Sequence, residues 1–318
     1  MANEKPHLVT VLGPTATGKT SFAARFAMEV GGEIISADSR QVYRRMDIGT
    51  GKDLEDYIIR DFKVPVHLID IAEPGYKYNV FEFQRDFLKV LKNILSRGAC
   101  PVLCGGTGMY IEAVLKGYRL VQVPHDENLR KDLEKMSDEQ LTAILSEHRK
   151  LHNVSDTSSR KRLVRAVEIA LYQSRHGEPE NCFSPGLRKL IFGITAGRNE
   201  RRRRITVRLE KRLESGMIEE VKGLMDEGVS PDDLKFYGLE YKFVTMYLLG
   251  EIDYETMFAR LNTAIHQFAK RQMTWFRRME RQGFIIHWFD ADMPEVLKIE
   301  KAVRLYKQAQ QRADNSGY

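Results

Sequence analysis

Residues 13–20 have the composition of a phosphate-binding loop, because they read GPTATGKT and directly follow the apolar run 8–12. The spacing of the two glycines from the final lysine and threonine is that of a phosphate loop between a strand and a helix. In such a loop the backbone N–H groups and the helix N-terminus hold phosphate oxygens, while the lysine adds positive charge. The threonine hydroxyl can ligate Mg²⁺. The expected phosphate-binding residues are Gly13, Pro14, Thr15, Ala16, Thr17, Gly18, Lys19 and Thr20, with Mg²⁺ at Thr20.

Asp38 is a second candidate for chemistry, since the segment EIISADSRQVY places it at the end of the second apolar run. A carboxylate there could take a proton from an acceptor during group transfer from a phosphorylated donor. It could equally cap the following helix, as aspartate often does. Two reaction classes follow from the residues alone. Either the phosphate itself moves, as in a small kinase, or the phosphates leave and another group moves.

The elements that must position these residues alternate between short apolar strands and helical segments over the first 117 residues. Strands are predicted at 8–12, 33–36, 66–69 and 101–104, and the apolar run 190–195 returns to strand character. Loops at the carboxyl ends of parallel strands share one edge of a sheet. The segments 13–20, 38–41 and 105–108 should therefore converge. We predict an α/β fold with a P-loop NTPase-like parallel sheet flanked by helices.

Residues 118–186 interrupt this pattern with charged, leucine-spaced helices and no strand pattern, so we expect an inserted all-helical domain between two parts of the core, 1–117 and 187–318. A capping box from Ser137 to Gln140 opens one helix. Basic residues 160–162 surround the first turn of another, and they favour a phosphate-bearing partner. A solvated basic face is the alternative.

Two further helices carry basic residues beside an apolar stripe. In the segment NERRRRITVRLEKRL, Arg204, Arg208 and Arg212 flank the stripe and could reach into a crevice. In the helix predicted over 255–281, the polar Gln272 interrupts the stripe between basic side chains. Trp275 in that helix could stack on bases or belong to the core.

The bulk composition of the 318 residues, with 42% hydrophobic content and a net charge of +6, predicts a globular enzyme-sized chain. Its three cysteines follow no metal-ligand or disulfide spacing, which suits a reducing cytosol. No leader pattern and no run of 18 apolar residues occurs. We expect a cytoplasmic protein that acts as a monomer and does not bind a membrane.

Seven segments, in order, carry a resemblance to a known family. They are GPTATGKT, ISADSRQVYRRMDIGTGK, HLIDI, GGTGMYIEAVLKG, KRLVRAVEI, RITVRLEKRLESGMIEEV and AKRQMTWFRR, spanning residues 13–278. In this order they closely resemble the tRNA dimethylallyltransferase (tRNA isopentenyltransferase) family. The segment KFYGLEYKFV, residues 235–244, departs from the family pattern, which has tyrosine and a basic residue after the glycine.

The resemblance implies a reaction and its residues. The phosphate loop would hold dimethylallyl diphosphate, and its five-carbon group would pass to the exocyclic N6 amine of the adenosine 3′-adjacent to the tRNA anticodon, releasing diphosphate. Asp38 would be the general base and Thr107 a substrate-positioning hydroxyl, while Lys19, Mg²⁺ and Arg208 would stabilise the leaving diphosphate. The implied contacts to the anticodon stem-loop are Asp38, Ser39, Arg40, Gln41, Ser158, Ser159, Arg160, Lys161, Arg162, Lys270, Arg271, Gln272, Trp275 and Arg277.

Three other functions remain alternatives on the sequence. The first is an adenylate isopentenyltransferase that acts on free nucleotide, which would not require the helical insertion or the basic segments. The second is an ATP-using small-molecule kinase with the same loop. The third is a non-catalytic RNA-binding protein.

Overall fold

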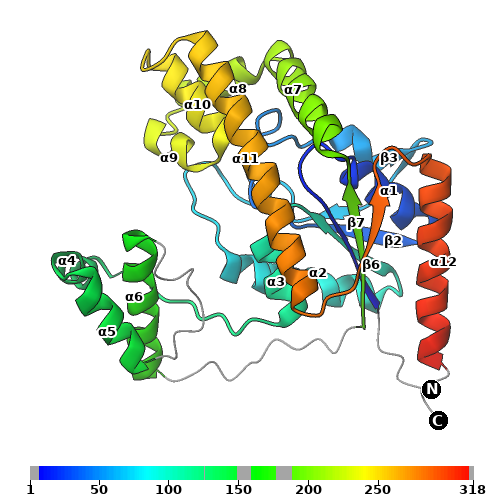
Figure 1. Cartoon of the computed structure of the whole chain (residues 1–318), viewed down its shortest axis with the longest axis horizontal. Helices are drawn as coiled ribbons and strands as arrows, with labels where there is room; N and C mark the ends of the chain where they lie inside the picture. Colours follow the sequence, from blue (N-terminus) through cyan, green and yellow to red (C-terminus); the bar gives the residue numbers. More distant parts are fainter. Residues whose placement is uncertain (1–6, 125, 149–158, 177–187, 315–318) are drawn as a thin grey trace. The chain divides into compact units, whose positions relative to one another are not determined.

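A computed structural model describes residues 7–124, 126–148, 159–176 and 188–314 (Figure 1). Its contacts divide the chain into two compact units. The first consists of Met1–Lys116 with Pro185–Tyr318, and the second is Gly117–Ser184. None of the described helices is long and apolar enough to cross a membrane.

The first unit is built on a six-stranded sheet with the order β5-β2-β6-β1-β7-β8, and all of its strand pairs are parallel. This confirms the predicted α/β fold. The strand β8, which pairs with β7, was not predicted; in its segment IHWFD, Ile286 and Phe289 are buried and Asp290 is exposed. The strands are β1 (His7–Leu12), β2 (Gly32–Ser36), β5 (Val66–His67), β6 (Cys100–Gly105), β7 (Arg188–Thr195) and β8 (Ile286–Asp290). A separate hairpin pairs β3 (Ile58–Ile59) with β4 (Phe62–Lys63).

The strands β2, β6 and β1 are neighbours, and this order brings three loops together. Val102 of β6 is in register with Val9 of β1 on one side and with Ile34 of β2 on the other. The segments that follow these strands therefore leave the sheet at the same edge, as parallel pairing requires. One of them is the predicted phosphate loop.

Helices cover both faces of the sheet. On one face, α1 (Lys19–Glu29) and α12 (Glu295–Asp314) enclose a core made by alternate strand residues such as Val9, Val11 and Phe192. In Figure 1 these helices lie near each other on the right of the view, and they contact each other. The helices α2 (Val80–Ser96) and α3 (Gly108–Lys116) contribute nothing to that core and contact β6, so they cover the opposite face.

A second core joins five helices to the segment after β2. It includes Tyr43, Leu209, Tyr241 and Leu261, all almost fully buried. The long helix α11 crosses in front of the sheet in Figure 1 and contacts both α7 and α3. These helices are α7 (Arg198–Glu214), α8 (Met217–Asp226), α9 (Pro231–Phe236), α10 (Leu239–Leu248) and α11 (Tyr254–Arg281). A 3₁₀ helix, η1, covers Leu54–Tyr57.

The second unit contains α4 (Glu127–Lys135), α5 (Asp138–His148) and α6 (Arg160–His176) around a core of leucine, valine and alanine side chains. The expected capping box is present, because Gln140 N donates to Ser137 Oγ while Ser137 N donates to Gln140 Oε1. Glu168 is buried between Arg130 and Arg165. Burial alone would raise the pKa of Glu168, but hydrogen bonds from the two arginines hold it below its usual value.

Candidate active site

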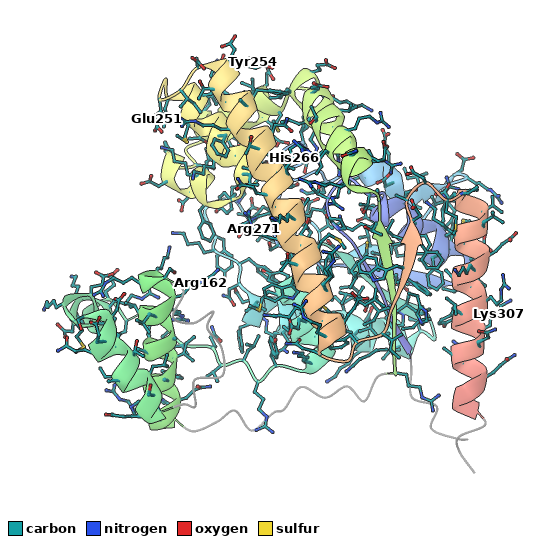
Figure 2. All side chains as sticks on the ribbon, in the orientation of Figure 1. Arg162, Glu251, Tyr254, His266, Arg271 and Lys307 are labelled. Carbon is teal, nitrogen blue, oxygen red and sulfur yellow. The ribbon has the colours of Figure 1, made fainter. Side chains whose placement is uncertain are left out.

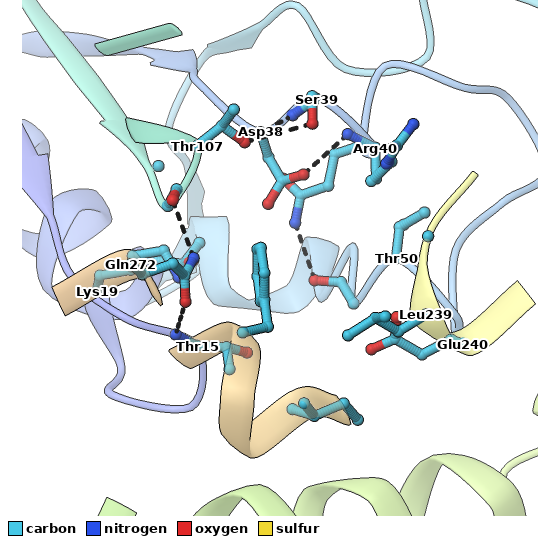
Figure 3. A pocket seen from close by; sticks show the side chains of 18 of the residues that line it. Thr15, Lys19, Asp38, Ser39, Arg40, Thr50, Thr107, Leu239, Glu240 and Gln272 are labelled. Atoms are coloured by element: carbon cyan, nitrogen blue, oxygen red, sulfur yellow. Dashed lines mark hydrogen bonds between the residues drawn. The ribbon is translucent and has the colours of Figure 1, made fainter. Parts of the chain in front are cut away.

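A pocket with a cavity of about 470 Å³ opens where the three strand-end loops meet (Figure 3). The loops after β1, β2 and β6 form one part of its wall, α7, the start of α10 and α11 form another, and residues of the segment 49–57 and of the start of α3 add to it. All of these elements belong to the first unit. The pocket therefore combines the predicted phosphate loop with Asp38 and with side chains that lie more than 150 residues further along the chain.

The phosphate loop has little room for other residues. A side-chain carbon at Gly13 would lie 2.4 Å from the carbonyl oxygen of Ile194, and Gly18 has φ +76°, a conformation that favours glycine. The Thr17 hydroxyl donates a hydrogen bond to the Pro14 carbonyl at 2.9 Å and so braces the turn from within. Because α1 begins at Lys19, its N-terminal N–H groups are available to an anion in the pocket.

Lys19 lines the pocket together with Arg208, Arg212 and the acidic Asp38. Burial lowers the pKa of Lys19, and the charges of Arg208 and Arg212 lower it further, while Asp38 acts in the opposite direction. An anion placed among these cations would gain three favourable interactions at once. The electrostatics of the site thus match a phosphate-bearing ligand.

Gln272 fixes the phosphate loop to α11. Its Oε1 accepts a hydrogen bond from Thr15 N, and its Nε2 donates to the carbonyl of Gly106, both at 2.9 Å (Figure 3). The residue is 6% exposed, so these bonds satisfy a buried amide. The polar interruption in the apolar stripe of α11 is therefore a clamp between two of the strand-end loops.

Asp38 lies in the pocket opposite Gln272, half-buried, in the turn that follows β2. Its Oδ1 accepts a hydrogen bond from Arg40 N at 2.9 Å. The neighbouring Ser39 N donates to Thr107 Oγ1 at 3.1 Å, which ties the β2 loop to the β6 loop. Asp38 thus makes a local turn contact and still has a second carboxylate oxygen available to a ligand.

Arg208 and Arg212 of α7 both line the pocket, and each has an acidic partner. Arg208 forms an ion pair with Asp53, while Arg212 Nη1 lies 3.6 Å from Glu240 Oε1. Burial raises the pKa of Glu240 and the charge of Arg212 opposes that rise. A side-chain carbon at Gly51 would collide with both guanidinium groups, so the main chain at 51 passes directly against them.

The apolar part of the pocket wall comes chiefly from α11 and the start of α3. Trp275 touches the Gly108 backbone so closely that a side chain at 108 would not fit. The Arg278 guanidinium stacks 4.2 Å from the Trp275 ring centroid and also pairs with the buried Glu112. In the part of the chain that the structure describes, no acceptor meets the buried indole N–H of Trp275. This ring is held in place and has one unused donor.

The structure places half of the residues predicted for the site on the wall of one pocket. Those that line the pocket are Thr15, Lys19, Thr20, Asp38, Ser39, Arg40, Gln41, Thr107, Arg208, Arg271, Gln272 and Trp275. Lys270 and Arg277 are exposed on α11 outside the lining, and Arg271 is exposed at mid-helix (Figure 2). Gly13, Pro14, Ala16, Thr17 and Gly18 shape the loop without being part of the lining.

The predicted tRNA contacts in the insertion lie in the second unit. Ser159, Arg160, Lys161 and Arg162 are exposed at the start of α6, where Figure 2 labels Arg162, and Ser158 lies outside the described residues. Arg160 is engaged within its own unit, because it pairs with Asp138 and donates to the carbonyl of Glu134 at 2.8 Å.

Sequence reasoning missed the roles of Asp53, Glu240 and Glu220. Glu220 accepts hydrogen bonds from the consecutive backbone N–H groups of residues 47, 48 and 49, at 2.7–3.0 Å, and so fixes the segment that leads to the pocket. Glu240 lies in the segment 235–244 that departs from the family pattern, and this departure is the signal that could have found it. No sequence pattern pairs Asp53 with an arginine 155 positions away.

Thr20 is the residue on the pocket wall that fits the expected Mg²⁺. Its hydroxyl has no hydrogen-bond partner within the described ranges, and a hard oxygen donor suits this ion. The described residues contain no group of three histidine, cysteine or acidic side chains that could hold a metal by themselves. Phosphate oxygens and water would have to complete the coordination.

Comparisons with known proteins place the chain among transferases. A family model described as IPP transferase matches residues 41–279, and one described as isopentenyl transferase matches residues 6–61. The chain is 58% identical over 292 residues to tRNA dimethylallyltransferase 2 of Bacteroides fragilis, which covers 92% of this chain and 95% of that protein. It is 56% identical over 299 residues to tRNA dimethylallyltransferase 1 of Porphyromonas gingivalis, with 94% and 99% covered.

Solved structures show the same similarity to transferases that act on tRNA. The crystal structure of a tRNA isopentenylpyrophosphate transferase from Bacillus halodurans superimposes with a TM-score of 0.71 at 32% identity, covering 98% of this chain and 99% of that one. A eukaryotic dimethylallyltransferase acting on tRNA has a TM-score of 0.73 at 20% identity, covering 90% of this chain and 74% of that one, and it supports the fold alone.

Proposed function

The chain belongs to the IPP transferase family and is a dimethylallyltransferase that acts on tRNA, and from this premise we propose how its pocket carries out the transfer. The acceptor in this proposal is the exocyclic N6 amine of the adenosine 3′-adjacent to the anticodon. The donor is dimethylallyl diphosphate, with its diphosphate group on the phosphate loop.

One observation carries the proposal: Asp38 and Lys19 line the same cavity, with Arg208 beside them. The cations and the N-terminus of α1 suit a diphosphate leaving group. The Asp38 carboxylate can accept the proton that the attacking amine loses. A kinase would not require a base placed beside an apolar wall, which here fits a five-carbon chain.

The proposed reaction forms one bond and breaks another. The N6 nitrogen of adenine attacks the first carbon of the dimethylallyl group, and the bond from that carbon to the diphosphate oxygen breaks. The electron pair leaves with the diphosphate, whose charge Lys19 and Arg208 stabilise. The adenine amine is a weak nucleophile because its lone pair is delocalised into the ring. Transfer of its proton to Asp38 completes the substitution.

Thr107 and Ser39 position this carboxylate in the proposal. The Thr107 hydroxyl accepts from Ser39 N and lies within 3.4 Å of the Ser39 hydroxyl, so the two loops move together. Mg²⁺, held by Thr20 and by diphosphate oxygens, would neutralise charge on the leaving group.

The partner proposed for the surface around the pocket is the anticodon stem-loop. The target adenosine must leave its stack to reach Asp38, and an apolar wall with an aromatic ring can receive a displaced base. Arg40 and Arg271 on the pocket wall, with Lys270 and Arg277 on the exposed surface of α11, would contact the RNA. The second unit contributes Lys161 and Arg162 in this proposal. A monomeric state and a cytoplasmic location stay predictions.

Two acceptors test the function directly. Radiolabelled dimethylallyl diphosphate should label tRNA and leave AMP unlabelled, and the label should map to the adenosine beside the anticodon. Equal labelling of AMP would favour the free-nucleotide enzyme. Steady ATP turnover with a small-molecule acceptor would favour a kinase.

Asp38→Asn tests the proposed base. Asparagine keeps an oxygen that can accept from Arg40 N, so the turn should survive while proton transfer is lost. We expect kcat to fall by about 10²- to 10⁴-fold with tRNA affinity nearly unchanged. Asp232→Asn, on the exposed surface of α9, is the matched control. A rate close to that of the wild type would remove Asp38 from the chemistry.

A further inference from the structure

Arg208, which faces the phosphate loop, already has an anionic partner within the protein. Its Nη2 donates to the carboxylate of Asp53, and the two side chains form an ion pair. Asp53 precedes the 3₁₀ helix η1, yet its side chain makes no capping hydrogen bond to that helix. The carboxylate is therefore directed to the arginine instead of to the local backbone.

The main chain that carries Asp53 is firmly held. Glu220 binds three consecutive N–H groups of the segment 47–49, and Gln41 Nε2 donates to the Gly51 carbonyl at 3.0 Å. Lys52 is fully buried and donates to Tyr43 O at 2.8 Å and to Asp47 at 2.6 Å. The backbone cannot withdraw the carboxylate, but the Asp53 side chain is 52% exposed and can rotate into water.

The pocket contains repelling cations when no anion is bound. The charges of Arg208 and Arg212 lower the pKa of Lys19, and Arg212 has Glu240 at 3.6 Å as its own partner. Glu240 lines the pocket itself and is largely covered, at 20% exposure. Of the two acidic partners, Asp53 is thus the one that can move aside without leaving a buried charge unpaired.

We propose that Asp53 is an internal counter-ion that holds Arg208 in the free enzyme and releases it when the diphosphate group binds. The inference rests on the proposed function, which assigns the diphosphate to Arg208. A diphosphate oxygen and the Asp53 carboxylate compete for one guanidinium, and the two anions repel each other. Asp53 therefore lowers the affinity for the diphosphate of both substrate and product and speeds the release of the product.

The test measures the Kd of inorganic diphosphate with Mg²⁺ by calorimetry on the full chain. Asp53→Asn removes the competing charge, and we expect the Kd to fall by about three- to thirty-fold, the range for one exposed ion pair plus one nearby like charge. Asp61→Asn is the matched control, since Asp61 is exposed in the β3–β4 turn at φ 65°, which asparagine tolerates. Its Kd should stay within about twofold of the wild type.

Arg208→Gln separates a local effect from a general one. In that background Asp53→Asn should tighten binding clearly less than in the wild type, because the group for which the two anions compete is gone and only their direct repulsion remains. In steady state, Asp53→Asn should also strengthen inhibition by the diphosphate product and lower the KM for dimethylallyl diphosphate more than it changes kcat.

Each other outcome decides against the proposal. Weaker diphosphate binding in Asp53→Asn would make Asp53 part of the binding site, and an unchanged Kd would make the ion pair irrelevant to the ligand. Tightening of the same size in Arg208→Gln as in the wild type would show a general charge effect. If the wild type bound no diphosphate, the proposed diphosphate site itself would be wrong. If the wild type bound diphosphate but Asp53→Asn did not tighten binding, only the counter-ion role of Asp53 would be wrong.

Discussion

Gln272 Oε1 accepts a hydrogen bond from the backbone N–H of Thr15 at 2.9 Å, so a side chain of α11 holds the phosphate loop by its main chain. The same amide donates to the Gly106 carbonyl. Two loops of the sheet and the longest described helix thereby share one buried group. The helix that carries exposed basic residues cannot shift without disturbing the loop that is proposed to hold the diphosphate.

Gln272→Ala should destabilise the protein. It leaves the Thr15 N–H and the Gly106 carbonyl without their partner in a buried place, which costs about 1–3 kcal/mol of the free energy of unfolding. Urea unfolding followed by circular dichroism measures this loss. Gln267→Ala, exposed on the same helix, should change the free energy by less than about 0.5 kcal/mol. Equal effects would mean that the amide bonds contribute nothing.

Lys19 should make diphosphate binding dependent on pH. Burial lowers the pKa of Lys19 from 10.5, so the free protein loses this proton at a pH where the unfolded chain still keeps it. The stability contributed by Lys19 therefore rises with pH through that window. Diphosphate favours the charged amine, so its affinity should fall as pH rises through the lowered pKa, and binding there should take up a proton.

Calorimetry in two buffers of different ionisation enthalpy measures the proton uptake by Lys19. Lys19→Ala should bind diphosphate weakly at every pH and take up no proton. Proton uptake that remained in this variant would assign the titration to another group.

Substitutions at Arg160 and Lys161 should have different effects: the first should change the stability of the second unit, and the second should change tRNA binding. Arg160 joins α6 to Asp138 and to the carbonyl of Glu134, so Arg160→Ala should lower the melting temperature. Lys161 is exposed, and Lys161→Ala should flatten the log–log dependence of tRNA affinity on salt by about 0.7–0.9. Lys161→Arg should restore the slope. A slope unchanged by Lys161→Ala would remove this residue from the RNA contact.

Trp275 should report on the pocket through its fluorescence. The chain has two tryptophans. The second, Trp288, does not line the pocket, and its indole N–H donates a hydrogen bond to Glu280 at 2.8 Å. In Trp288→Phe, the anticodon stem-loop should change the emission of Trp275, because a base stacks on its ring or binds its indole N–H. In Trp275→Phe the emission of Trp288 should hardly respond. Equal responses would place the RNA contact elsewhere.

Features that depend on neighbouring residues could be predicted from the amino-acid sequence. The phosphate loop could be predicted because glycine spacing, the preceding strand and the following helix lie within about twenty positions. The parallel sheet followed from the alternation of apolar runs with helical segments, and the capping box at Ser137 from a four-residue pattern. Family resemblance implied roles for Asp38 and Thr107, whereas the residues alone left Asp38 undecided between a base and a cap.

Contacts between distant segments could not be predicted from the sequence and are visible only in the folded chain. Gln272 meets Thr15 across 257 positions, and Arg208 meets Asp53 across 155. Such pairs arise from strand order and from how α7 and α11 pack on the sheet, and helical periodicity predicts which face a residue occupies but not what that face meets. For the same reason β8 escaped prediction: a five-residue apolar segment becomes a strand only because β7 offers it an edge.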